Sequence, residues 1–233
     1  MSADKFLNIH NLSYAYGKQQ VLDRLSVDLY PAQLTALLGL NGQGKSTLLR
    51  LIAGVLPSPL PAVNFTSNKP SIGYMPERPL SFPELSVIDN LRFAAQINRM
   101  NEADMAAALQ QTLSDCHLQD KANKPAGSLS KGYQQRLGLA MAIVHGPQLI
   151  LLDEPTDGMD PAQLQSTWQL IGRLAQNSCV VLSSHRISEV AEHCQRVLVM
   201  HQGQIRDQLM MDDAAARQSL AGRFHQITAG DEV

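Results

Sequence analysis

The chain has 233 residues, of which 44% are hydrophobic and 17% charged, so it is long for one ordinary domain and short for two. Its 19 basic and 21 acidic residues give a formal net charge of −2, whereas a protein that mainly binds nucleic acid is more often basic. The three widely spaced cysteines form no CxxC pair, which argues against a disulfide framework or a zinc site, and the first residues lack the apolar segment of a secretory signal.

Apolar and polar residues partly alternate over residues 6–17 and 21–30, and this pattern predicts an early pair of strands. Near-continuous apolar runs follow at residues 34–40, 149–153 and 180–184. Runs without alternation are typical of parallel strands that helices cover on both faces. Helical patterns separate these runs, and a last hairpin is expected near Gly203. The sequence therefore predicts an α/β fold with a mostly parallel sheet flanked by helices.

The middle of the chain has a different character. Three prolines lie between residues 76 and 83, and three helical stretches follow them. We interpret about residues 81–145 as a helical subdomain inserted into a core that spans about residues 1–80 and 146–211. That core would include a small antiparallel β-subdomain. The tail, residues 212–233, is expected to start as a short helix and then fray, because its end is small and polar.

Residues 39–47, GLNGQGKST, match the phosphate-loop pattern G-x-x-x-x-G-K-[ST] between a predicted strand and a predicted helix. Glycines in such a loop let several N–H groups turn toward one anion, and the helix start adds its positive end. We expect Lys45 to pair with the β- and γ-phosphates of a nucleotide and Ser46 to bind Mg²⁺. An incidental glycine-rich turn is the alternative, which the strand and helix on either side disfavour. The predicted nucleotide contacts here are Gly39, Leu40, Asn41, Gly42, Gln43, Gly44, Lys45, Ser46 and Thr47.

Residues 149–155, LILLDEP, end an apolar strand with two carboxylates. Ligands of open α/β sheets bind at the carboxyl ends of strands, so Asp153 is expected to help hold Mg²⁺. Glu154 is placed to accept a proton from a water that attacks the γ-phosphate. A solvated turn or a helix cap before Pro155 is the alternative for an isolated Asp-Glu pair. Together with the phosphate loop, these residues predict a P-loop NTPase, which leaves open a transporter motor, a helicase, a kinase or a DNA-repair ATPase.

The stretch LSKGYQQR, residues 129–136, is an unusual start for a helix. Ser130 is a natural N-cap, yet Gly132 in the first turn costs about 1 kcal/mol relative to alanine. The sequence itself offers no other reason for glycine there, so we expect some other group to approach this helix start closely. A capped helix of the protein core is the alternative.

With these residues the chain resembles the nucleotide-binding domain of ABC (ATP-binding cassette) transporters over nearly its whole length. LSKGYQQR stands where the family has its LSGGQ signature, and LILLDEPTDGMDP matches Walker B followed by the D-loop residue Asp160. His185 after VVLSS matches the switch histidine, and SIGYMPE, residues 71–77, matches the Q-loop segment. Tyr16 matches the aromatic residue that stacks on adenine, with Tyr14 as its nearest alternative. Six motifs in the right order are far more specific than any one of them.

The resemblance implies one ABC ATP-binding domain over residues 1–233 that pairs head to tail with a second such domain, as a homodimer or a heterodimer. Each signature helix would then point at the γ-phosphate of the ATP that the other chain holds. The residues expected to contact that ATP in trans are Ser130, Lys131, Gly132 and Tyr133. His185 would assist hydrolysis beside Glu154.

Some residues depart from the family pattern. Glu77 occupies the Q-loop place where glutamine is commonest, and its carboxylate could coordinate Mg²⁺ directly. Lys131 and Tyr133 replace two residues of the GGQ sequence. These departures resemble the branch of the family that works with ABC-2 type membrane subunits, mostly exporters.

The implied function is that of a subunit that binds and hydrolyses ATP with Mg²⁺ and energises a separate membrane permease. No run approaches the roughly 18 apolar residues needed to span a bilayer, so a cytoplasmic subunit, peripheral on the inner membrane and without a nucleic-acid partner, is expected. About residues 77–100 would form the groove that receives a helix of the permease. One alternative is a soluble ABC ATPase that acts on ribosomes or DNA, although such relatives usually carry two cassettes or a long coiled-coil insertion. The other is a regulatory module without turnover, which the presence of Glu154, His185 and Asp160 disfavours.

Overall fold

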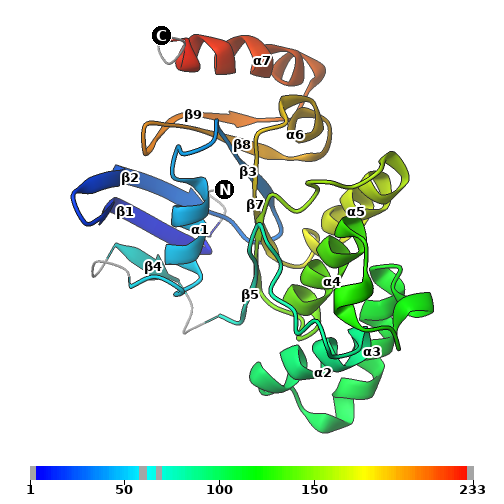
Figure 1. Ribbon diagram of the computed structural model, residues 1–233. Coiled ribbons are helices and arrows are strands. Elements are labelled where there is room, and N and C mark those ends of the chain that lie inside the picture. Colours follow the sequence, from blue (N-terminus) through cyan, green and yellow to red (C-terminus); the bar gives the residue numbers. More distant parts are fainter. Residues whose placement is uncertain (1–3, 58–61, 67–69, 230–233) are drawn as a thin grey trace.

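The computed structural model describes residues 4–57, 62–66 and 70–229 of the chain. A six-stranded sheet forms its centre, and a three-stranded sheet lies beside it (Figure 1). The six-stranded sheet has the order β5 (Ile72–Met75), β6 (Leu149–Asp153), β7 (Cys179–Ser184), β3 (Leu34–Leu38), β8 (Arg196–His201) and β9 (Gln204–Met210). The smaller sheet has the order β2 (Gln19–Leu29), β1 (Leu7–Tyr16) and β4 (Val63–Phe65).

The central sheet confirms the prediction from the apolar runs. Strands β5, β6, β7, β3 and β8 pair in parallel, and only β9 is antiparallel to its neighbour β8. Every residue of β3, β6 and β7 is buried, because helices cover both faces of these strands. The expected hairpin is also present, since β8 and β9 are joined by a turn in which Gly203 has a φ of +71°.

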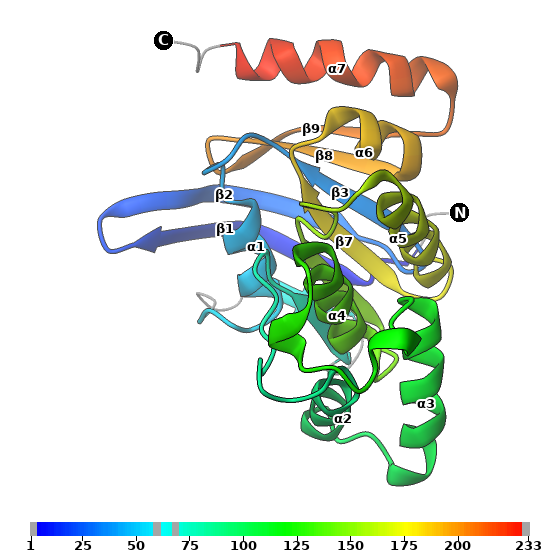
Figure 2. The ribbon, with the colours of Figure 1, turned by 45° about the vertical axis from the view of Figure 1, so that its right-hand side comes forward.

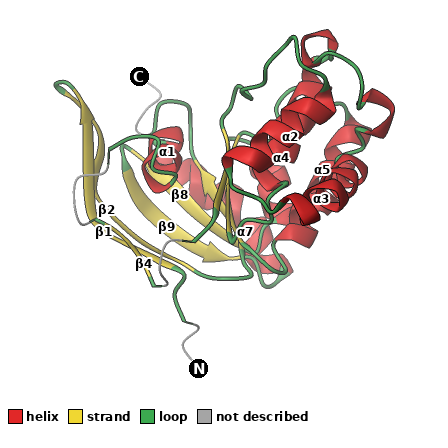
Figure 3. Cartoon of the chain, turned by 90° about the horizontal axis from the view of Figure 1, so that it is seen from below, coloured by secondary structure: helices red, strands yellow, loops and turns green. Residues whose placement is uncertain are grey.

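Helix α1 (Lys45–Ile52) lies between the two sheets, as the view from below shows (Figure 3). Its residues Leu48, Leu49 and Ile52 join one hydrophobic core with the inner faces of β1 and β2 and with Leu149 and Val181 of the central sheet. Strands β1 and β2 therefore belong to an antiparallel sheet that packs against α1, the helix after the phosphate loop. This arrangement fixes where the N-terminus of α1 lies.

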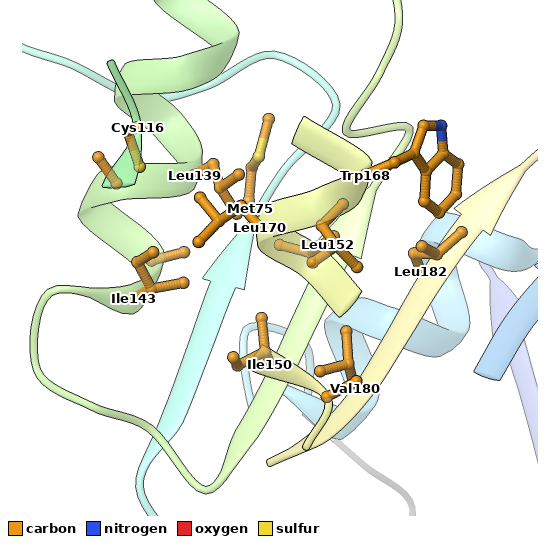
Figure 4. Packing of buried hydrophobic residues seen from close by; sticks show 14 of the residues in the cluster. Met75, Cys116, Leu139, Ile143, Ile150, Leu152, Trp168, Leu170, Val180 and Leu182 are labelled. Carbon is orange, nitrogen blue, oxygen red and sulfur yellow. The ribbon is translucent and has the colours of Figure 1, made fainter. Parts of the chain in front are cut away.

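The remaining helices lie on the other side of the central sheet, some packed directly on it and others on those helices (Figure 2). They are α2 (Val87–Ile97), α3 (Glu102–Asp115), α4 (Lys131–Ile143), α5 (Pro161–Leu174), α6 (Ile187–His193) and α7 (Ala214–Thr228), with short 3-10 turns at Gln119–Lys121 and Ala126–Ser128. In the core on this face, Met75, Leu139, Leu152 and Leu170 pack together (Figure 4). The helical region is therefore continuous with the core of the sheet.

Helix α4 makes the closest of these contacts. A Cβ atom on Gly73 of β5 would lie 2.0 Å from the carbonyl oxygen of Ala142, so only glycine lets α4 approach the strand this closely. At the same helix, a Cβ atom on Gly138 would lie 2.4 Å from Cβ of Pro79. The segment after β5 is thus packed directly on α4, and these two elements are positioned together.

The C-terminal tail differs from the expectation of a short, fraying helix. Helix α7 spans 15 residues, and Leu220, Phe224 and Thr228 are buried at successive intervals of four. Their spacing places them on one helix face, which packs on β9 and α6 because the tail has an apolar stripe. Residues 230–233, where fraying was also expected, lie outside the described residues. In the part of the chain that is described, no helix has the length and apolar character required to cross a membrane.

Candidate nucleotide-binding site

A cavity of about 670 Å³ opens at the carboxyl ends of β3, β6 and β7. It is lined by most of the residues that the sequence predicts as nucleotide contacts, namely Tyr16, residues 41–47, Glu77, Glu154 and His185. Strand β7 pairs with both β3 and β6, so the ends of three parallel strands converge here. The structure therefore brings residues from five separate parts of the sequence to one site.

The phosphate loop depends on three glycines with different roles. Gly42 and Gly44 have φ values of +80° and +98°, which residues with a side chain rarely adopt. A Cβ atom on Gly44 would also lie 2.7 Å from Leu22 of β2, and one on Gly39 would lie 2.7 Å from the carbonyl oxygen of Met200. The loop thus depends on backbone conformation at Gly42 and Gly44 and on close packing at Gly39 and Gly44.

Lys45 begins α1 and is buried at the floor of the cavity. Its Nζ atom donates hydrogen bonds to the carbonyl oxygens of Gly39 (2.7 Å) and Leu40 (3.0 Å) and lies 4.0 Å from Oε1 of Glu154. Burial lowers the pKa of Lys45, and the neighbouring carboxylates partly oppose that effect. The ammonium group therefore lies where a phosphate group would compensate for its lost hydration.

Asp153 is fully buried at the end of β6. Its Oδ1 atom accepts hydrogen bonds from the hydroxyl groups of Ser46 (3.0 Å) and Ser183 (2.7 Å). Its Oδ2 atom is buried without a hydrogen-bond partner among the described residues. A buried carboxylate oxygen without a partner beside a serine hydroxyl fits the oxygen ligands that Mg²⁺ prefers, so the residues present fit the predicted metal.

Glu154 follows Asp153 in a left-handed conformation, with a φ of +49°. The backbone N–H of Glu154 donates a hydrogen bond to the hydroxyl group of Ser183 (2.9 Å), and this contact holds the peptide in place. The Oε2 atom of Glu154 lies 3.1 Å from Nδ1 of His185, and both side chains line the cavity. The predicted general base and the predicted switch histidine are therefore in direct contact.

Two tyrosines were candidates for the adenine platform. Tyr16 lines the cavity and is 44% exposed, whereas Tyr14 does not line it and packs against the core around α1. The rings of the two residues meet edge to face, with centroids 5.1 Å apart. This geometry favours Tyr16, whose ring Tyr14 supports from the side. Glu77 also lines the cavity, and its carbonyl oxygen accepts a hydrogen bond from Gln135 of α4.

The signature residues lie on α4 and do not line the cavity of their own chain. Ser130 occupies the N-cap position in an extended conformation, but its side chain makes no capping hydrogen bond to the helix. Tyr133 packs against the helical core, with Lys121 and Arg136 over its ring. These residues therefore lie outside the cavity that the phosphate loop lines.

Gly132 lies against a side chain of the same chain. A Cβ atom at this position would lie 2.0 Å from Oε1 of Gln163, near the start of α5. Asp160, predicted as the D-loop residue, caps the same helix by accepting a hydrogen bond from the backbone N–H of Gln163 (2.9 Å). The amide of Gln163 therefore lies against this helix start, but it is the end of a flexible side chain that could move aside, so packing within the chain does not by itself require glycine here.

Four residues of the site were missed by the sequence analysis, namely Ser183 and the cavity-lining residues Gln19, Val21 and Asp157. Ser183 binds both Asp153 and the peptide of Glu154, and Asp157 lines the cavity. A polar residue at the end of a buried apolar strand is the pattern that could have indicated Ser183. Asp157 has no such local pattern, because its partner Lys131 is 26 positions away.

An α/β fold with a glycine-rich phosphate loop after β3 and buried Asp153 at the end of β6 defines a P-loop nucleoside triphosphatase. The family model described as ABC transporter matches residues 22–157 of the chain. The chain belongs to this family, as an ATP-binding domain of the kind that hydrolyses ATP to power transport.

Known proteins agree with this assignment. The bacitracin transport ATP-binding protein BcrA of Bacillus licheniformis is 31% identical over 218 residues, which cover 89% of this chain and 70% of that protein. The Nod factor export ATP-binding protein I of Rhizobium etli is 33% identical over 208 residues, covering 84% and 66%. Among solved structures, an ATP-binding subunit of an ABC transporter superposes with a TM-score of 0.84 at 24% identity, covering 95% of this chain and 98% of that one. The last similarity concerns the fold alone.

Proposed function

We propose that the protein is the ATP-hydrolysing subunit of an exporter, peripheral on the cytoplasmic face of a membrane and driving a separate permease. The observation that supports it most directly is the Glu154–His185 pair in a cavity lined by the phosphate loop. Such a pair suits hydrolysis rather than nucleotide storage. Export is the proposed direction because a similar protein is named for Nod factor export, and another is named for bacitracin transport.

In this proposal the side chains of the cavity divide the chemistry of hydrolysis among them. Lys45 pairs with the β- and γ-phosphates, and Glu154 accepts a proton from the attacking water. His185 orients Glu154 and donates to the γ-phosphate. Mg²⁺, held by Ser46 and Asp153 with Glu77 nearby, would neutralise charge on the phosphates.

We also propose that two chains, identical or different, pair head to tail. The uncapped Ser130 at the start of α4 and the N–H groups around Gly132 would then bind the γ-phosphate of the partner's ATP. Because each ATP would bridge two chains, binding favours the closed pair by mass action. Loss of the γ-phosphate removes that bridge, and the pair reopens.

The site for the permease is the second element of the proposal. A groove of about 810 Å³ lies between the segment after β5 and helices α2 and α4. Leu80, Phe82 and Ile97, which line it, are 78%, 45% and 62% exposed, which is unusual for large apolar side chains of a solvated surface. Leu85, also expected at this surface, does not line the groove. A helix of the permease with an apolar face would cover these residues.

The test uses the full chain with Glu154→Gln. This variant is expected to bind ATP, lose turnover and elute as a stable dimer in ATP during size-exclusion chromatography, while ADP leaves it monomeric. Pull-down of a polytopic membrane protein with the tagged chain is the second readout. A Glu154→Gln protein that stays monomeric in ATP even with its membrane partner, or that turns over normally, would overturn the proposal. Recovery of ribosomes or DNA in place of a membrane protein would favour the soluble alternative.

A further inference from the structure

An ion pair joins the signature helix to the loop that follows Glu154. The Nζ atom of Lys131, the first residue of α4, lies 2.7 Å from Oδ2 of Asp157. Asp157 comes three residues after Glu154 and lines the nucleotide cavity. The start of α4 is therefore tied to the nucleotide site of its own chain, although its own side chains do not enter that site.

Gly158, next to Asp157, leaves room for the side chain of Lys131 in this ion pair. Gly158 has a φ of +74°, and a Cβ atom there would lie 2.7 Å from Cδ and 2.9 Å from Nζ of Lys131. The lysine stem consequently lies along the bare peptide of Gly158 on its way to Asp157. The side chains of Lys131 and Asp157 are 63% and 38% exposed, so this is a surface ion pair, a kind whose loss changes rates or stabilities only modestly.

Asp157 contacts a second cation on its other side. Its Oδ1 atom lies 3.7 Å from Nη2 of Arg186, the residue directly after His185. Arg186 is held in turn by Glu189, at 2.7 Å. The hydrogen bond from Lys131, with help from the charge of Arg186, lowers the pKa of Asp157, so the carboxylate stays ionised beside both cations. A continuous row of charges thus runs from the signature helix to the residue after the switch histidine.

We propose that Asp157 is a positioning residue that couples the two nucleotide sites of the paired ATPase, an inference that rests on the head-to-tail arrangement proposed above. In that arrangement the signature helix of a chain serves its partner's ATP, while Glu154 and His185 serve its own. The row Lys131–Asp157–Arg186 connects these two sets through one chain. Lys131 then acts on Asp157, and the contact with the partner's phosphate belongs to Ser130 and the helix backbone.

The experiment compares Lys131→Met, Asp157→Asn and the double variant by steady-state ATPase rates over a range of ATP concentrations. Each single change is expected to lower kcat about three- to fivefold and to bring the Hill coefficient for ATP toward 1, with KM little changed. The double variant is expected to be no slower than either single one, because both remove the same contact. Lys131→Arg keeps the charge and should retain most of the rate and the cooperativity.

Arg173→Ala is the matched control. It breaks an exposed ion pair with Asp115, 3.4 Å long, between α5 and α3, and should leave rate and cooperativity unchanged. Melting curves for all variants establish that each one is folded. A readout of cooperativity separates coupling from a general loss of stability, which would lower the rate without changing the Hill coefficient.

Two results would overturn the inference. If Asp157→Asn keeps or raises the rate while Lys131→Met lowers it, Lys131 binds phosphate directly. If the double variant loses the product of the two single losses, about tenfold or more, the residues act independently. The Glu154→Gln variant distinguishes failure of the coupling from failure of the dimer. If Glu154→Gln forms an ATP-dependent dimer and either kinetic result above is found, only the coupling through Asp157 is rejected. If Glu154→Gln forms no dimer in ATP, the head-to-tail arrangement is rejected.

Discussion

The Nδ1 atom of His185, which follows β7, lies 3.1 Å from Oε2 of Glu154, which follows the neighbouring strand β6. A histidine in this place orients the carboxylate that is proposed to accept a proton. We therefore expect His185→Ala to lower kcat for ATP about 100-fold or more, with KM changed by less than about threefold. Steady-state ATPase assays measure both constants. His10→Ala, an exposed histidine of β1, is the control and should behave like the unmodified protein. A rate for His185→Ala close to normal would remove this residue from the mechanism.

Lys45→Met is expected to abolish ATP binding and yet stabilise the protein without nucleotide. Burial lowers the pKa of Lys45 below its ordinary value of 10.5, so folding is penalised while the ammonium is charged. That penalty is fully present on the acidic side of the folded-state pKa and fades as the pH rises from there toward 10.5. The melting temperature at pH 7 should rise by ~2–4 °C, which corresponds to about 1 kcal/mol, and the gain should shrink near pH 10.

Differential scanning fluorimetry with and without ATP tests both parts of this prediction. Unmodified protein should melt at a higher temperature in ATP, and Lys45→Met should show no such increase. Lys18→Met, at an exposed site between β1 and β2, is the control for loss of a positive charge. A lower melting temperature for Lys45→Met without nucleotide would show that its hydrogen bonds to Gly39 and Leu40 outweigh its desolvation.

Alanine at Gly44 should destabilise the fold more than alanine at Gly42. Both glycines have positive φ, so each substitution costs about 1–2 kcal/mol in backbone strain. Gly44→Ala adds a collision with Leu22 and the carbonyl oxygen of Val21, for another 1–3 kcal/mol or so. No atom lies within 4 Å of a Cβ on Gly42. Denaturant unfolding compares the two variants, and equal free energies of unfolding would contradict the packing argument.

Phe82→Asp in the groove is expected to uncouple transport while leaving the ATPase rate of the isolated subunit within about twofold of normal. Phe82 is exposed and packs edge to face on Phe93, at 4.7 Å between ring centroids, so its loss removes an apolar contact surface and little core. Transport in membranes and pull-down of the permease are the measurements. Met210→Asp, an exposed apolar residue of β9 outside the groove, is the control. Equal loss of transport and of soluble ATPase activity would count against a docking role.

Phe224→Ala tests whether α7 belongs to the folded core. Phe224 is 4% exposed, so its truncation should lower the free energy of unfolding by about 3–5 kcal/mol. The exposed neighbour Gln226, changed to alanine, should alter stability by less than about 0.5 kcal/mol. Equal, small effects at both positions would mean that the tail contributes nothing to folding.

Local patterns in the sequence were sufficient for the parts of the site that are contiguous. The phosphate loop needs only a strand, glycines and a helix start in succession, and residues 39–47 contain all of them. Asp153 could be predicted for the same reason, since an apolar run that ends in a carboxylate indicates a strand end. The structure places both where the patterns indicate.

Contacts between distant segments could not be predicted from those patterns. Gln163 lies against Gly132, and Lys131 is paired with Asp157, but nothing in the local sequence joins these positions. The apolar stripe of α7 was present in the sequence at Leu220 and Phe224. It was outweighed by the small polar residues at the end of the chain, because burial of that stripe depends on the surface that β9 and α6 offer.

The position of β7 between β3 and β6 has a consequence for synthesis of the chain. A ribosome has already made the phosphate loop and Asp153 when residues 179–184 are still to be added. Until that strand is inserted, the hydroxyl of Ser46 and the carboxylate of Asp153 cannot meet, because their strands are not neighbours. We therefore expect a nascent chain to complete its nucleotide site only after residues 179–184 have been added.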